Sequence, residues 1–356
     1  MSPMFVPGPV DVAPEVLQQQ TRPMMPHRNK DFEATFRGAA EKAQKIFATE
    51  HRVFLMTNSG SGAQEAAVRN LANERVLSCV NGAFSKRWYT VAQANGKQAD
   101  LLEVPMAHAI TPDMVEEALK KQKYDLITVV HNETSTGVMN PIKEIAAVVH
   151  RVSPDTLVAV DAVSSAAGVK IEMDAWGIDC VFTSSQKALA LPPGLALCAV
   201  NERGMQRAAG VTNRGWYFDF LLLEKHRVKD STPMTPAMSL IFALDFQMDR
   251  ILAEGLENRY ARHSAMAKRA QEWATQKGWP LFAQEGYRSQ TLTVVINPVE
   301  FDCADFNKFV APEKIRLANG YGDLKGKTFR IAHMGEIQLS DLEKLLGLID
   351  QYMIGK

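Results

Sequence analysis

Short apolar runs alternate with stretches of helical periodicity over the first two thirds of the chain, and this alternation constrains the fold more than any other feature. The runs lie at residues 52–56, 76–80, 100–104, 125–130, 156–160, 180–182 and 195–200. Between them, a 3.6-residue period predicts helices, most clearly at 111–121 and 141–150. Strands and helices that alternate in this way predict an α/β domain with a largely parallel sheet.

The pattern changes after about residue 240, where helical periodicity runs from 239 to 277 with a break near Gly255. Strands are expected at 279–282, 291–297 and 328–333, and helices at 302–309 and 340–354, the last with Ser340 and Glu343 as a capping box. We therefore divide the chain into an extended N-terminal arm (1–20), a large domain (21–245) and a smaller C-terminal α+β domain (246–356).

Composition excludes several classes of protein. The formal charge is zero, with 40 Lys and Arg against 40 Asp and Glu side chains, whereas nucleic-acid binders usually carry a basic excess. No apolar run approaches the ~20 residues of a membrane-spanning helix. The four cysteines lack the spacing of metal ligands or of a disulfide framework. We therefore expect no nucleic-acid partner, no membrane partner, no metal and a cytoplasmic location.

A glycine-rich turn follows the first expected strand. Residues 58–65 (NSGSGAQE) open a helix, and glycines at a helix start let backbone N–H groups approach an anion. The turn is neither a Walker A loop nor a GxGxxG motif, because Glu65 stands where the last glycine would be. By itself it is compatible with an anion site and equally with a plain strand-to-helix connection.

Three expected strands end in polar residues. The strand at 125–130 leads into HNETSTG (131–137), that at 156–160 into Asp161, and that at 180–182 into Lys187. Ligands of parallel α/β sheets bind at the carboxyl ends of the strands. The ordinary interpretations are a helix N-cap for Asp161 and a solvated surface lysine for Lys187.

The sequence after Lys187 disfavours the surface interpretation, because ALALPPG (188–194) carries no charge. A lysine desolvated there would have a lowered pKa and would suit bonding to an aldehyde. A lysine with an upstream aspartate is the pair that pyridoxal 5'-phosphate uses: the lysine bonds the aldehyde and the aspartate keeps the ring nitrogen protonated.

Residues 182–196 (FTSSQKALALPPGLA) resemble the lysine segment of class V aminotransferases, in the alanine/serine–glyoxylate aminotransferase group. Six further segments are similar to that group in the same order along the chain: 5–10 (FVPGPV), 59–62 (SGSG), 131–141 (HNETSTGVMNP), 160–165 (VDAVSS), 232–236 (TPMTP) and 329–335 (FRIAHMG). The resemblance implies a pyridoxal-phosphate-dependent transferase of fold type I, with a mainly parallel seven-stranded sheet. It also implies a homodimer with shared active sites.

The resemblance assigns roles to the matching positions. Lys187 would hold the cofactor and then move the substrate's Cα proton, Asp161 would pair with the ring nitrogen, and Arg330 would bind the substrate carboxylate, which its planar fork fits. Gly8, in the N-terminal arm, would lie at the substrate. The remaining cofactor-binding residues implied in this way are Ser61, Gly62, Ala63, Phe84, Thr134 and Gln186, with Thr232 and Thr235 reaching the neighbouring subunit's phosphate.

Other activities stay open. The favoured reaction moves an amino group from alanine or serine to glyoxylate or pyruvate, and aspartate or ureidoglycine are alternative donors. A cysteine desulfurase resembles the chain in outline, but it has histidine where Gln186 stands and needs a reactive cysteine, for which Cys303 is the candidate. Ala63 replaces a histidine of some relatives beside the phosphate. A nucleotide-binding α/β protein that uses the glycine turn, or a non-catalytic scaffold, are the other classes.

Overall fold

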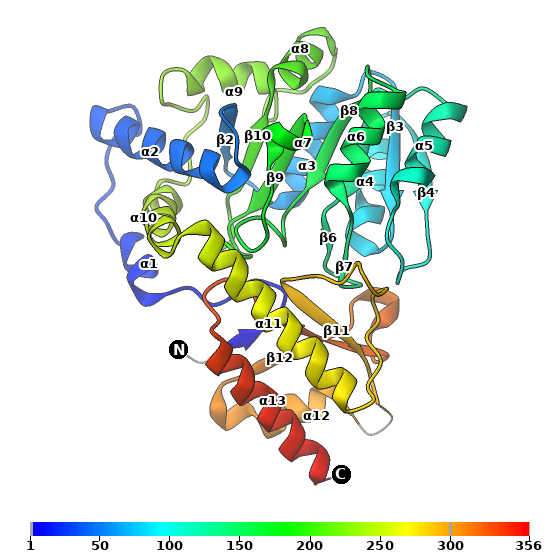
Figure 1. Cartoon of the computed structure of the whole chain (residues 1–356). Helices are drawn as coiled ribbons and strands as arrows, with labels where there is room; N and C mark the ends of the chain where they lie inside the picture. Colours follow the sequence, from blue (N-terminus) through cyan, green and yellow to red (C-terminus); the bar gives the residue numbers. More distant parts are fainter. Residues whose placement is uncertain (1–2, 299–300, 356) are drawn as a thin grey trace.

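Two β-sheets organise the protein, a computed structural model of which describes residues 3–298 and 301–355 (Figure 1). The larger sheet has seven strands in the order β2-β10-β9-β8-β5-β3-β4. Only β10 runs antiparallel to its neighbours β2 and β9, so the mainly parallel seven-stranded sheet expected from the sequence is confirmed. The strands are β2 (Arg52–Met56), β3 (Arg75–Val80), β4 (Gln98–Glu103), β5 (Leu126–Val130), β8 (Leu157–Asp161), β9 (Cys180–Ser184) and β10 (Ala196–Val200).

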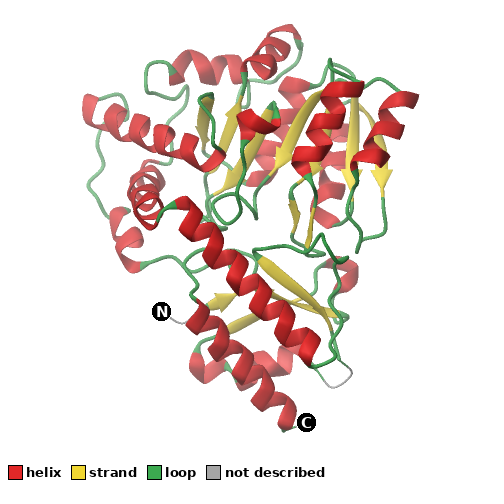
Figure 2. Cartoon of the chain, viewed as in Figure 1, coloured by secondary structure: helices red, strands yellow, loops and turns green. Residues whose placement is uncertain are grey.

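Helices cover both faces of this sheet, which explains why its strands are apolar on both sides (Figure 2). In β2, Val53 and Leu55 pack on one face while Phe54 and Met56 pack on the other. The first face is covered by α2 (Lys30–Phe47), α5 (Pro112–Lys121), α6 (Ile142–Val152), α7 (Met173–Trp176) and α10 (Met238–Glu254). The second is covered by α3 (Gly60–Leu71), α4 (Ala83–Ala94), α8 (Glu202–Gly210) and α9 (Phe220–Arg227).

The smaller sheet has the order β1-β12-β13-β11 and lies with both ends of the chain in the lower part of Figure 1. Its core is rich in aromatic rings, and those of Phe301 and Phe329 are 4.4 Å apart. The elements are β1 (Met4–Phe5), β11 (Leu292–Ile296), β12 (Arg316–Asn319), β13 (Thr328–Ala332), α11 (Leu256–Gln276), α12 (Cys303–Phe309) and α13 (Leu339–Ile354). A two-stranded ribbon, β6 (Asn132–Glu133) with β7 (Val138–Met139), completes the strands of the described residues.

Three local expectations differ from the structure. Residues 279–282 form no strand, because Pro280 has no N–H to donate to a ladder, and only Leu281 makes an isolated bridge. The capping box of α13 is made by Gln338 and Asp341 in place of Ser340 and Glu343. The N-terminal segment is not simply extended: β1 pairs with β12, and α1 (Pro14–Gln19) packs on α10.

The long helical stretch breaks where the sequence indicates. Gly255 separates α10 from α11 with a φ of 84°, a conformation that suits glycine. Through this break the chain passes from the large sheet to the small one (Figure 1). The domain boundaries at residues 20 and 245 stay predictions. None of the helices in the described part of the chain has the length and hydropathy to cross a membrane.

Candidate active site

A cavity of about 220 Å³ lies at the carboxyl-terminal edge of the large sheet. Its walls come from the ends of β5, β8 and β9 and from the starts of α3 and α4. Six of the residues singled out from the sequence line it: Ser61, Phe84, Thr134, Asp161, Gln186 and Lys187. The other lining residues are Ser59, Gly60, Gln64, Arg87, Val130, Asn132, Val163, Ser164 and Ser184.

Lys187 lies in the loop between β9 and β10, in contact with the N-terminal segment. Its amine donates a hydrogen bond to the carbonyl of Pro7. The next residue, Gly8, has a φ of 118°, and a Cβ there would lie 2.7 Å from Cδ and 2.9 Å from Nζ of Lys187. Burial, followed by the positive charge of Arg330, lowers the pKa of Lys187 to about 8. A substantial fraction of this amine is therefore neutral near pH 8.

Asp161 is the last residue of β8 and is buried at the cavity wall. One carboxylate oxygen accepts a hydrogen bond from the Val163 amide at 2.9 Å, and the other accepts one from Gln64 Nε2 at 3.0 Å. Burial raises the pKa of Asp161 to about 6. A cationic group beside this carboxylate would offset the cost of its burial. Gln64 lies within the glycine-rich turn motif, but the motif alone predicted no role for this side chain.

The glycine-rich turn forms the start of α3. Ser61 lines the cavity, whereas Gly62 and Ala63 do not. The amides of Gly62 and Ala63 donate to the carbonyl of Ser59 at 2.9 and 3.3 Å, so they are already used within the turn. No backbone acceptor for the Gly60 and Ser61 amides occurs in the described residues, as expected for the first turn of a helix. The positive end of α3 therefore faces the cavity at Gly60 and Ser61.

Arg87, which no sequence motif singled out, adds a cation at this end of the cavity. It lies three residues after Phe84 on α4, and its guanidinium is 5.1 Å from the centre of the Phe84 ring. Nη1 donates to Ser61 Oγ at 2.8 Å. No carboxylate pairs with Arg87 within 4 Å in residues 3–298 and 301–355. The spacing of three residues from Phe84 on one helix face is the signal that could have found it.

Arg330 approaches the cavity from the small sheet but, like Gly8, is not among the residues that line it. It lies in the middle of β13, where Nη1 donates to the carbonyl of Thr134 at 3.3 Å and Nε donates to the carbonyl of Asn319 at 2.9 Å. The ring of Tyr321 lies 5.7 Å from its guanidinium and also packs on Phe84, with ring centres 5.1 Å apart. Burial lowers the pKa of Arg330 to about 10. Nothing in the sequence pointed to Tyr321.

Thr232 and Thr235 do not line the cavity. The Thr232 hydroxyl donates to the carbonyl of Met234 at 2.5 Å, and Thr235 is exposed. Within one chain these two residues therefore do not join the other candidates.

Buried polar atoms without partners indicate what the cavity can hold. Ser184 Oγ, Gln186 Oε1 and Gln64 Oε1 have no hydrogen-bond partner within the described residues. Such atoms are rare in native interiors and indicate a polar ligand or solvent. An amine, a buried carboxylate, a helix start beside an arginine, and an aromatic ring provide complementary groups for an aldehyde, a ring nitrogen, a phosphate and a flat ring. The residues present therefore fit pyridoxal 5'-phosphate.

Comparison with known proteins agrees with this fit. The family described as Aminotransferase class-V matches residues 15–323. The chain belongs to the class V aminotransferases. Enzymes of this family depend on pyridoxal phosphate, so this protein is a pyridoxal-phosphate-dependent aminotransferase.

Relatives cover nearly the whole chain. An uncharacterized aminotransferase of Methanocaldococcus jannaschii is 39% identical over 340 residues, which cover 93% of this chain and 87% of the relative. The L-aspartate–glyoxylate aminotransferase of Paracoccus denitrificans is 33% identical, with coverage of 99% and 91%. The crystal structure of an alanine–glyoxylate aminotransferase from Nostoc sp. superimposes with a TM-score of 0.92 at 28% identity, with coverage of 98% and 94%.

Proposed function

We propose that this aminotransferase moves an amino group from a small amino acid, alanine or serine, to a small 2-oxo acid, glyoxylate or pyruvate, in two half-reactions. The observation that carries the proposal is the pair Lys187 and Asp161 on one cavity of about 220 Å³, with Arg330 beside it. Bound pyridoxal phosphate supplies an aldehyde that bonds amines and a ring that withdraws electrons from the adjoining carbon.

The side chains would divide the work as follows. Lys187 Nζ would take the proton from the substrate Cα and return it, because an amine with a pKa of about 8 can serve as both base and acid near neutral pH. Asp161 would hold a positive charge at the ring nitrogen. Arg330 would bind the substrate's α-carboxylate through two hydrogen bonds.

The second arginine bears on the choice of substrate. Arg87 contacts Ser61 at the start of α3, so we assign it to the cofactor phosphate together with Gly60 and Ser61. No further arginine or histidine lines the cavity in the described part of the chain. With Arg330 alone for the substrate, a donor with one carboxylate fits better than aspartate.

Desulfuration of cysteine fits less well. Cys303 is buried at the start of α12, where burial raises the pKa of its thiol to about 11 and disfavours the reactive thiolate. No exposed cysteine occurs among the described residues.

A homodimer is the proposed assembly. Trp216 is 62% and Tyr217 40% exposed, and large exposed aromatic side chains favour a protein interface. Thr235 is exposed as well and would contribute to the neighbour's site from there. Sedimentation should give about twice the chain mass of 39.4 kDa.

The reaction is tested with purified enzyme, pyridoxal phosphate and a panel of donors (alanine, serine, aspartate) and acceptors (glyoxylate, pyruvate, 2-oxoglutarate). Lys187→Ala should lower turnover by a factor on the order of a thousand or more. Lys170→Ala, at an exposed lysine, is the control and should leave turnover unchanged. Full activity of Lys187→Ala would refute the mechanism.

Arg87→Gln separates the two uses of the second arginine. If Arg87 binds the phosphate, this variant weakens cofactor binding and affects every donor alike. A loss confined to aspartate would show instead that Arg87 binds a second substrate carboxylate, and that the donor is dicarboxylic.

A further inference from the structure

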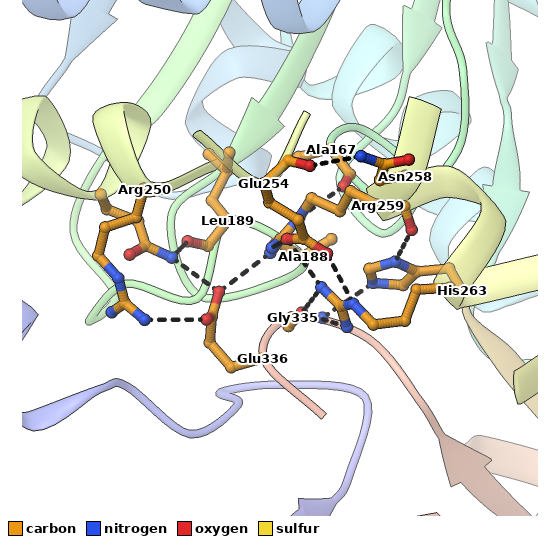
Figure 3. A network of polar contacts seen from close by, with 12 residues as sticks. Ala167, Ala188, Leu189, Arg250, Glu254, Asn258, Arg259, His263, Gly335 and Glu336 are labelled. Carbon is orange, nitrogen blue, oxygen red and sulfur yellow. Dashed lines mark hydrogen bonds and ion pairs between the residues drawn. The ribbon is translucent and has the colours of Figure 1, made fainter. Parts of the chain in front are cut away.

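A buried arginine at the start of α11, Arg259, contacts three segments near the site, at Ala167, Ala188 and Glu336 (Figure 3). Arg259 is 1% exposed. Its guanidinium donates to the carbonyl of Ala188, the residue after Lys187, at 2.7 Å and to the carbonyl of Ala167 at 3.0 Å. It also pairs with Glu254 at 2.6 Å and with Glu336 at 3.2 Å. All the polar atoms of this arginine therefore point at fixed backbone or carboxylate partners.

Among the partners of Arg259, Glu336 is the one that follows β13, a strand of the small sheet. It accepts from Gln247 Nε2 at 3.0 Å and pairs with Arg250 at 3.3 Å, in addition to Arg259. Gln247 also donates to the carbonyl of Leu189 at 3.0 Å. We call residues 185–195, between β9 and β10, the lysine loop. Two donors, Arg259 and Gln247, each bond one carbonyl of this loop, and both also bond Oε1 of Glu336.

The segment that ends in Glu336 is the continuation of β13, the strand of Arg330. Gly335 packs on the lysine loop: a Cβ there would be 3.4 Å from the Cβ of Ala190 and 3.8 Å from the carbonyl of Lys187. Its carbonyl accepts from Arg262 at 3.2 Å, and its amide donates to His263 at 3.2 Å. The end of the arginine strand is therefore fixed against the lysine loop from several directions.

The lysine loop also contains strained backbone. Ala190 has a φ of 54°, and Ala167, whose carbonyl Arg259 holds, has a φ of 65°. Left-handed conformations are unfavourable for alanine and persist only where the surroundings impose them. The Arg259 contacts are part of those surroundings.

Stability alone is a poor reason for such a network. Because desolvation offsets most of the attraction, a buried ion pair adds little to stability compared with an apolar replacement, whereas in some proteins it fixes one defined geometry. Here the network links the loop that contains Lys187 to the segment that follows β13, the strand of Arg330.

We propose that Arg259 and Glu336 are positioning residues that set the separation between Lys187 and Arg330, so that a substrate held by its α-carboxylate presents its Cα to the amine. The proposal rests on the proposed function, since it takes Arg330 as the carboxylate site. Neither residue lines the cavity, so both act through the segments that they hold.

Glu336→Gln in the cofactor-loaded enzyme tests the proposal. The amide keeps the size of the side chain but turns an N–H group toward the donors Arg259 or Arg250. We expect the KM of amino donor and 2-oxo acid to rise about tenfold, while the dissociation constant of pyridoxal phosphate changes less than twofold. The matched control is Glu343→Gln, which breaks the exposed pair of α13 with Arg269 of α11 and should leave both constants unchanged.

A second variant, Arg259→Lys, keeps the charge but cannot fork to Ala188 and Ala167, and it should raise KM in the same way. If these variants lower the melting temperature but keep the wild-type KM, the network is structural and the proposal is wrong. If the wild type transfers no amino group, the proposed function fails. Calorimetric binding of glyoxylate then still tests the positioning, and equal affinities of wild type and Glu336→Gln overturn it.

Discussion

The two halves of the active site are built in different ways. Lys187 and Asp161 follow or end central strands of the large sheet, where the topology by itself brings strand ends to one edge. Arg330 lies in the middle of a strand of the small sheet, and only the packing of the two sheets' domains brings it to Thr134. The cofactor side of the site therefore belongs to one sheet, whereas the substrate side depends on how the two units pack together.

The largest effect is expected from the cofactor side. Asp161→Asn keeps the shape and the hydrogen bond with Gln64 but removes the charge that would hold the ring nitrogen protonated. Turnover should fall roughly a thousandfold, the size of effect seen when one preorganised electrostatic group is lost. Steady-state kinetics with the absorption spectrum of the bound cofactor measure this. Asp155→Asn, at an exposed position, serves as the control.

A substitution on the substrate side should change mainly KM, whereas Asp161→Asn changes turnover. Arg330→Gln removes a charged, bidentate donor, so kcat/KM should fall about a hundredfold, mostly through KM, with cofactor affinity retained. Arg316→Gln, at an exposed position of the neighbouring strand β12, should have no effect. A loss of cofactor binding in Arg330→Gln would contradict the division of the site into two halves.

The N-terminal segment lies between the halves, since β1 belongs to the small sheet while Gly8 contacts Lys187. Gly8→Ala would place a methyl group 2.7 Å from the Lys187 side chain, at a φ that alanine avoids. We expect about a tenfold loss of kcat/KM. Ala substituted at Gly278, which has a positive φ but open space around it, is the matched control for backbone strain. Equal losses of kcat/KM in both variants would show that the contact of Gly8 with Lys187 does not affect catalysis.

The smallest effect concerns pH. The pKa of Lys187 is lowered to about 8, mainly by burial and then by Arg330, so the neutral, reactive amine forms as pH rises through about 8. The rate at which cofactor-free protein bonds an aldehyde should therefore be half-maximal near pH 8, two to three units below an ordinary lysine. Arg330→Gln should move this midpoint upward. A midpoint near 10 in the wild type would show that the amine is solvated.

Much of the large domain could be predicted from the sequence. The apolar runs of β2, β5 and β8 are buried on both faces, and this continuous apolarity is what made them visible as strands. The small sheet was harder to predict. The strand β12 (Arg316–Asn319) has only one fully buried residue, and it was missed.

The candidate site divides in the same way. Lys187, Asp161 and Ser61 stand in local motifs, and the structure brings them to one cavity. Tyr321 stands in no motif and reaches the site through contacts with Phe84 and Arg330. Gln64 was within a recognised motif but received no role, because its partner Asp161 lies 97 residues away.

The sequence by itself determined the parallel sheet, the strand ends and the chemistry that a lysine and an aspartate can share there, because periodicity and residue type are local properties. Only the tertiary structure decided which side chains meet across the two sheets: Gly8 with Lys187, Arg87 with Ser61, and Arg259 with the loop and with Glu336. Those contacts depend on the packing of segments far apart in the chain, and no local pattern encodes the distance between them.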